Sequence, residues 1–131
     1  MPLIDIRTVS TAALAYFGDS VIELLVRRRL VAAGYSSSKS LNAEAKRFVT
    51  APAQAAAMER LLPHLTQEEA AIFRRGRNVG HTNTPKSATV AEYRSATGME
   101  ALFGYLYLTG QEARAEALFD LAYAGEGMTQ K

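Results

Sequence analysis

The chain of 131 residues contains no cysteine and no tryptophan, and it has only two histidines, His64 and His81. The lack of cysteine excludes disulfides, thiolate zinc sites and a cysteine nucleophile. Two histidines so far apart in the sequence are too few for a histidine-built metal site, and we expect both at the surface. A metal ion bound by this chain would therefore need oxygen ligands.

Long apolar runs are also missing. No window of the sequence reaches the roughly 18 uninterrupted apolar residues of a membrane span. The N-terminal segment Met1–Arg7 lacks a basic region followed by an apolar stretch of signal-peptide length, which predicts a cytoplasmic protein. With 131 residues, 48% of them hydrophobic, the chain can build one core but not two ordinary domains. We expect one domain over residues 1–131, with its core at about 10–124.

The distribution of helix caps and breakers predicts an all-α fold. Ser10 or Thr11 can cap a long first helix that runs to Gly34. The capping-box spacings Thr66–Glu69 and Thr89–Glu92 each begin a later helix. Further helices are expected at about 41–49, at 53–62 and at 111–124, and the two capping boxes begin helices that end near Gly76 and at Leu108.

Positive charge is concentrated in the middle of the chain. Between Arg74 and Arg94 the sequence has four arginines and Lys86, opposed only by Glu92. The segment Arg77–Lys86 is dense in Gly, Asn, Thr and Pro, so we expect an exposed loop. This part of the chain is the expected contact for a polyanion. The alternative is that arginines at a helix end interact with the terminal carbonyl groups of that helix.

Two isolated acids interrupt apolar helical stretches. Asp19 lies inside Leu14–Val26, whose other side chains are almost all apolar, and Glu100 is the only acid in residues 93–110. An ionised carboxylate in such surroundings is costly unless a cation receives it. The pair therefore suggests a shared metal ion. The alternative is that each acid pairs with a buried arginine or caps a neighbouring turn.

Small residues accompany both acids. Gly18 precedes Asp19, and Gly98 and Gly104 flank Glu100. A glycine inside a helix is less favourable than alanine by about 1 kcal/mol, which makes sense where two helices approach closely. Such an approach would bring the two carboxylates together. Mg²⁺ suits a site with few carboxylates and no soft ligands, and a Mg²⁺ site beside a basic surface indicates phosphodiester hydrolysis.

Two motifs in the chain resemble those of a known family. Tyr16–Val21 (Tyr-Phe-Gly-Asp-Ser-Val) is similar to the Phe-Leu-Gly-Asp-Ser/Ala-Val signature of the ribonuclease III family. Glu100–Leu108 resembles the second motif of that family, Glu-Ala-Leu-Ile-Gly-Ala-Leu-Tyr-Leu. Arg75–Asn78, Thr84–Lys86 and Tyr93–Arg94 bring the chain closest to the short branch, Mini-ribonuclease III, which lacks a double-stranded-RNA-binding domain.

This resemblance implies a helical endonuclease domain that forms a homodimer, with two sites across a valley for double-stranded RNA. It implies divalent-metal hydrolysis that leaves 5′-phosphate and 3′-hydroxyl ends, with Mg²⁺ as the cofactor and Mn²⁺ as a substitute. Asp19 and Glu100 match the metal ligands and catalytic acids of the two motifs. The short branch matures precursor 23S ribosomal RNA in bacteria, which implies this RNA as substrate and allows for a ribosomal protein that presents it.

The chain departs from the full-length enzymes at two positions where they carry acids: Ala15 stands four residues before the first motif acid, and Thr97 three before the second. The short branch shares such losses. Thr97 could hold a metal-bound water through its hydroxyl. Glu23 is a candidate further ligand or base, and an ion pair with Arg27 is the alternative. Tyr16 either stacks or hydrogen-bonds in the site or belongs to the core.

The RNA contact should depend mainly on shape, because A-form RNA exposes phosphates and 2′-hydroxyls and hides its base edges in a narrow groove. The residues expected to make this contact are Arg74, Arg75, Arg77, Asn78, Thr84, Lys86 and Arg94. Two alternatives stay open at this point. One is a catalytically inactive module of the same fold that binds double-stranded RNA or the ribosome, and the other is a helical protein-interaction domain.

Overall fold

The computed structural model describes residues 4–79 and 88–124. Within these residues the fold is all-helical, as the sequence predicts, and no strand occurs. None of the helices in the described ranges has the length and apolar character needed to cross a bilayer. The described elements are η1 (Ile6–Thr8), α1 (Thr11–Ala32), α2 (Ser38–Val49), α3 (Ala51–Leu61), η2 (Leu62–His64), α4 (Gln67–Arg77), α5 (Val90–Leu108) and α6 (Glu112–Ala122).

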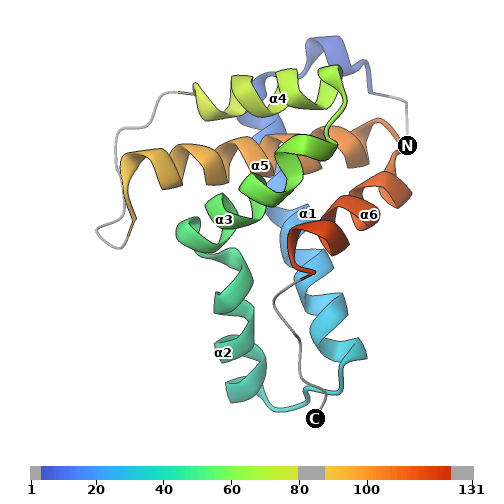
Figure 1. Ribbon diagram of the computed structural model, residues 1–131. Coiled ribbons are helices and arrows are strands. Elements are labelled where there is room, and N and C mark those ends of the chain that lie inside the picture. The colour runs from blue at the N-terminus through green and yellow to red at the C-terminus, as the bar shows by residue number, and fades with distance from the viewer. Residues whose placement is uncertain (1–3, 80–87, 125–131) are drawn as a thin grey trace.

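Helix α5 runs through the middle of the molecule (Figure 1). Helix α4 lies alongside it, α3 packs against it, and α1 crosses it on the far side in this view. The C-terminal half of α1 extends past α5 and packs against α2, while α6 contacts α3 and α5. Because α5 is covered on several sides, its buried residues include nearly every position from Ala96 to Leu106. Glu100 therefore lies on the most enclosed helix of the described fold.

Side-chain caps fix where most helices begin. Ser10 accepts a hydrogen bond from the backbone N–H of Ala13, and Thr66 and Thr89 form complete capping boxes with the glutamates three residues later. These helix starts confirm the sequence prediction. Helix α2 begins at Ser38, three residues before the expected start at about Leu41, because Ser37 accepts a hydrogen bond from Ser40 N–H and caps the helix earlier.

A buried ion pair joins α4 to α6. Arg114 on α6 donates from Nε and Nη2 to the two carboxylate oxygens of Glu69, at 2.9 and 2.8 Å. The same guanidinium donates to the backbone carbonyl of His64 at 2.8 Å. The hydrogen bonds from Arg114 hold the pKa of Glu69 below its usual value. This pairing fixes the position of α4, and hence of the arginines at its C-terminal end.

Candidate active site

Two glycines allow α1 and α5 to touch through their backbones. A Cβ atom on Gly18 would lie 1.6 Å from the carbonyl oxygen of Glu100, and one on Gly104 would lie 2.1 Å from the carbonyl oxygen of Leu14. No side chain fits in either place. The close approach predicted from these glycines is therefore confirmed, whereas Gly98 faces the Phe73 ring of α4 rather than α1.

The crossing brings the carboxyl groups of Asp19 and Glu100 into hydrogen-bond contact. Asp19 is exposed and Glu100 is half-buried. Burial, and then the charge and hydrogen bond of Asp19, raise the pKa of Glu100 to about 8. Glu100 therefore keeps its proton at neutral pH, and a positive charge placed beside it would favour loss of that proton.

A divalent cation fits this pair of acids. Mg²⁺ is commonly held by one or two carboxylates and keeps several of its waters. Its charge would favour ionisation of Glu100, whose pKa is raised by burial and by the neighbouring carboxylate. No group of three or more His, Cys, Asp or Glu side chains suited to a metal occurs in the described part of the chain. Water and substrate phosphate are the further ligands that Mg²⁺ commonly takes beside one or two carboxylates.

The raised pKa of Glu100 predicts that the metal-free protein loses stability between pH 6 and pH 9. The ordinary pKa of this carboxyl is 4.5, so between pH 4.5 and about 8 the folded state keeps a proton that the unfolded state has released. The resulting stabilisation is complete below pH 4.5 and is lost as the pH rises toward 8. At about 1.4 kcal/mol per pH unit, the loss between pH 6 and pH 9 is about 2 to 3 kcal/mol.

Denaturant unfolding in EDTA at the two pH values measures this loss. The Glu100→Gln variant has no proton to lose at this position, so its free energy of unfolding should depend less on pH. An equal pH dependence in the wild type and in Glu100→Gln would contradict the assignment. Added Mn²⁺ should stabilise the wild type more at pH 9 than at pH 6, because the cation binds the ionised pair.

A cavity of about 230 Å³ opens beside Glu100. Thr97, which is 8% exposed, lines this cavity and donates from its hydroxyl to the backbone carbonyl of Tyr93 at 3.1 Å. Its oxygen lone pairs remain available to a water in the cavity. The cavity is lined by Val49, Ala51, Gln54, Tyr93, Ala96, Thr97 and Glu100.

The other residues discussed with Asp19 differ in their surroundings. Glu23 accepts a hydrogen bond from Arg27 Nε at 3.0 Å, which is the ion pair given above as its alternative role. Tyr16 is 85% exposed, so the alternative that it belongs to the core is wrong, while its role in the site stays a prediction. Ala15 is buried.

All four arginines predicted to bind RNA are exposed: Arg74, Arg75 and Arg77 at the end of α4, and Arg94 near the start of α5. Within residues 4–79 and 88–124, none of them forms an ion pair or a hydrogen bond through its side chain. The alternative role at the terminal carbonyls of α4 is therefore not seen. The guanidinium of Arg77 lies over the Phe73 ring, 5.6 Å from its centroid. Exposed Asn78 follows as the C-terminal cap of α4.

The remaining residues predicted to bind RNA, Thr84 and Lys86, lie outside the described residues, as does His81. His64 is exposed at the end of η2, as expected.

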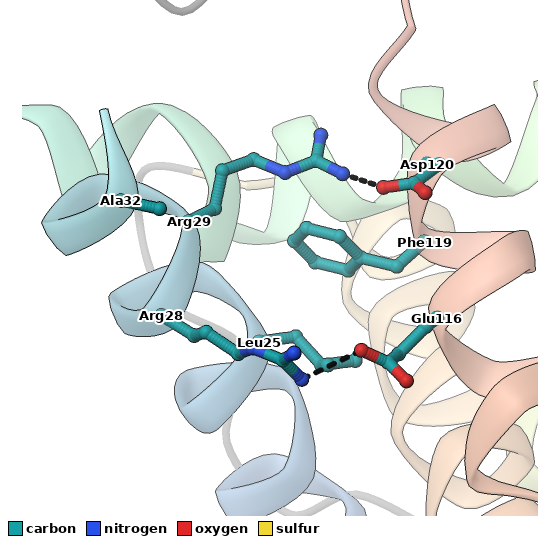
Figure 2. Close-up of a pocket in the computed structure, with 7 residues that line it drawn as sticks. All are labelled: Leu25, Arg28, Arg29, Ala32, Glu116, Phe119 and Asp120. Atoms are coloured by element: carbon teal, nitrogen blue, oxygen red, sulfur yellow. Dashed lines mark hydrogen bonds and ion pairs between the residues drawn. The ribbon is translucent and has the colours of Figure 1, made fainter.

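A second pocket, between α1 and α6, has a different character (Figure 2). Arg28 pairs with Glu116 at 2.6 Å, and Arg29 pairs with Asp120. The guanidinium of Arg29 also lies over the Phe119 ring, 5.0 Å from its centroid. Figure 2 shows both arginines reaching from α1 toward acids of α6. Both arginines are already paired with acids, and these two ion pairs stabilise the packing of α1 against α6.

Sequence reasoning missed Gln54, which lines the cavity beside Glu100 and is only 3% exposed. One signal was present: Gln54 is the only polar residue in the segment Ala53–Met58. The sequence does not show which face of α3 turns toward α5, so the burial of this side chain could not be predicted.

The chain is similar to known proteins over most of its length. Residues 12–111 match the Ribonuclease III domain. The chain is 45% identical to Mini-ribonuclease 3 of Symbiobacterium thermophilum, over 93% of this chain and 94% of the relative. It is 39% identical to Mini-ribonuclease 3 of Enterococcus faecalis, over 97% and 98% of the two chains. A crystal structure of a Fusobacterium nucleatum protein superposes with a TM-score of 0.83 and 32% identity, over 94% of this chain and 98% of the other.

The helical fold, the two motifs and these matches define a ribonuclease III family endoribonuclease, and the chain belongs to that family. Within it, the relatives that match nearly the whole chain carry the name Mini-ribonuclease 3, which confirms the resemblance to the short branch.

Proposed function

We propose that the protein is a Mg²⁺-dependent endonuclease that hydrolyses double-stranded RNA and leaves 5′-phosphate and 3′-hydroxyl ends. The observation that carries this proposal is the contact between the Asp19 and Glu100 carboxyl groups beside an open cavity. These two side chains would hold the cation, with Mn²⁺ as a substitute for Mg²⁺. The bound cation would supply a more acidic water and offset the charge on the scissile phosphate.

The proposed preference for double-stranded RNA is supported by the exposed arginines on α4 and α5. Arg74, Arg75, Arg77 and Arg94 have no acidic partner in the described ranges, so their charges are available to phosphates. Regularly spaced phosphates and 2′-hydroxyls distinguish an A-form duplex from a single strand. Asn78 and, beyond the described residues, Thr84 and Lys86 complete the proposed contact surface.

We also propose that the protein acts as a homodimer that pairs through α1. Phe17, Leu24 and Val31 repeat every seven residues on this helix and are exposed, and Tyr16 lies beside them. A stripe of exposed apolar side chains on one helix is typical of an interaction surface. A light-scattering mass of a single 14.2 kDa chain at micromolar concentration would contradict the dimer.

The proposed substrate is precursor 23S ribosomal RNA in the cytoplasm, with a ribosomal protein as a possible presenting partner. This step rests on the motifs that the chain shares with the short branch of the family. The alternative is an RNA-binding or ribosome-binding module that has kept the fold and lost the chemistry, and the replacement of acids by Ala15 and Thr97 is the feature in its favour.

Incubation of labelled RNA with the protein tests the activity directly. We expect duplex RNA to be cut in Mg²⁺ or Mn²⁺, no product in EDTA, and little cutting of either single strand alone. A precursor 23S fragment incubated in the same way gives the ends of the products, which should carry 5′-phosphates. Duplex binding without product at any metal concentration would support the inactive module instead. Equal cutting of duplex and single strands would contradict the proposed specificity.

A further inference from the structure

Three polar side chains are buried within the described part of the chain: Gln54, Glu69 and Thr97. Glu69 is bonded to Arg114, and Thr97 donates to a backbone carbonyl. Gln54 forms no hydrogen bond through its side chain with any residue that the structure describes, although it is only 3% exposed. A buried amide left without partners is unfavourable. Such a group in a folded protein calls for a water, an ion or a ligand.

The position of Gln54 indicates which of these it meets. Helix α3 begins at Ala51, with Thr50 as its cap, and places Gln54 in its first turns on the wall of the cavity beside Glu100. The cavity volume of about 230 Å³ is enough for several waters. Most of the other lining is apolar, so the polar groups of Gln54, Thr97 and Glu100 stand out within it.

We propose that Gln54 is a positioning residue of the active site, whose carboxamide binds a water that Glu100 also contacts and that belongs to the hydration shell of the catalytic cation. This inference rests on the proposed function. The amide oxygen would accept a hydrogen bond from this water, and the hydroxyl oxygen of Thr97 would accept one from a second water of the same shell. Both groups are neutral, so they would orient the waters without adding charge beside the Glu100 carboxyl group.

The same assignment explains how a site with few carboxylates could orient the waters of the proposed cation. Mg²⁺ holds its waters firmly, and these waters need acceptors that orient them. The described site has only two carboxylates, Asp19 and Glu100, to act as such acceptors. A buried amide from α3 and a hydroxyl from α5 would supply further acceptors, to the waters rather than to the metal. Groups that orient a metal site in this way typically change metal affinity or activity by about 10- to 100-fold when they are replaced.

The test uses Gln54→Met, which keeps the length of the side chain and removes its hydrogen bonds. In EDTA we expect a melting temperature equal to or above that of the wild type, because an unpartnered buried amide is lost. The Kd for Mn²⁺, measured by calorimetry without RNA, should rise about 10-fold or more. On duplex RNA, kcat should fall while KM stays unchanged. Gln54→Glu, which keeps the acceptor oxygen, should retain Mn²⁺ binding.

Gln67→Met is the matched control, since this glutamine is exposed at the start of α4; it should leave Mn²⁺ binding unchanged. An unchanged Mn²⁺ affinity in Gln54→Met, while Glu100→Gln loses it, would overturn the role of Gln54 and leave the proposed cation site standing. A wild type that binds no Mn²⁺ would overturn both. If Gln54→Met does not fold, loss of Mn²⁺ binding in a folded Gln54→Glu overturns the inference.

Discussion

Replacing Asp19 with asparagine is expected to lower the rate of duplex cleavage on the order of 10³-fold, without loss of folding or of duplex binding. The amide keeps the size of the side chain and can still bond to Glu100, but it lacks the negative charge that would hold the cation. The carboxyl contact described above makes this residue half of the proposed metal site. The effect should therefore fall on the chemical step rather than on the affinity for RNA.

Single-turnover cleavage at saturating protein measures this rate, and a filter-binding assay in Ca²⁺ or EDTA measures duplex binding separately. Asp5→Asn is a suitable control, because Asp5 is an exposed carboxylate bonded to Arg7, away from the α1–α5 crossing. It should cleave at the wild-type rate. An Asp19→Asn variant that folds, binds the duplex and cleaves at the wild-type rate would refute the catalytic role of Asp19.

Replacing Gly18 with alanine is expected to lower the free energy of unfolding by about 3 kcal/mol or more. In an ordinary helix interior this change would stabilise the protein by about 1 kcal/mol. Here the added Cβ would lie 1.6 Å from a backbone carbonyl oxygen of Glu100, which no side-chain rotation can relieve. The helices would have to separate, so the expected sign is opposite to that of helix propensity.

Urea unfolding followed by circular dichroism gives the free energy directly. Ser20→Ala is the matched control, because Ser20 is exposed on the same helix two residues later. It should change stability by no more than about 0.5 kcal/mol. A Gly18→Ala protein as stable as the wild type would show that α1 and α5 do not cross in backbone contact.

The helices were predictable because their starting signals are local. Thr66 with Glu69 and Thr89 with Glu92 satisfy free amides within four residues, so the spacing alone reveals them. The early start of α2 was missed because several serines precede it and only the structure shows that Ser37 acts as the cap. The first residue of such a helix depends on which of several serine side chains accepts the capping hydrogen bond.

The site was predictable only in part. Asp19 and Glu100 stood out because an acid is conspicuous in an apolar helix, and the glycines beside them indicated close approach. The burial of Gln54 on the cavity depends on how α3 packs against α5, which no local pattern encodes. Pairs such as Arg28 with Glu116, which lie 88 positions apart in the sequence, cannot be predicted from a local pattern either. Charge density located the cluster of arginines, whereas their lack of acidic partners became visible only in the fold.

The backbone contact at Gly18 also limits how the site can move. Neither helix can slide along the other without driving a carbonyl oxygen into an α-carbon, so the spacing of the two acids is set by main chain rather than by rotamers. Because the two backbones are already in contact, α1 cannot move closer to α5 when a substrate binds. If the protein binds duplex RNA as proposed, adjustment to different RNAs would have to come from the nucleic acid, from the proposed cation and its waters, and from the arginine-bearing ends of α4 and α5.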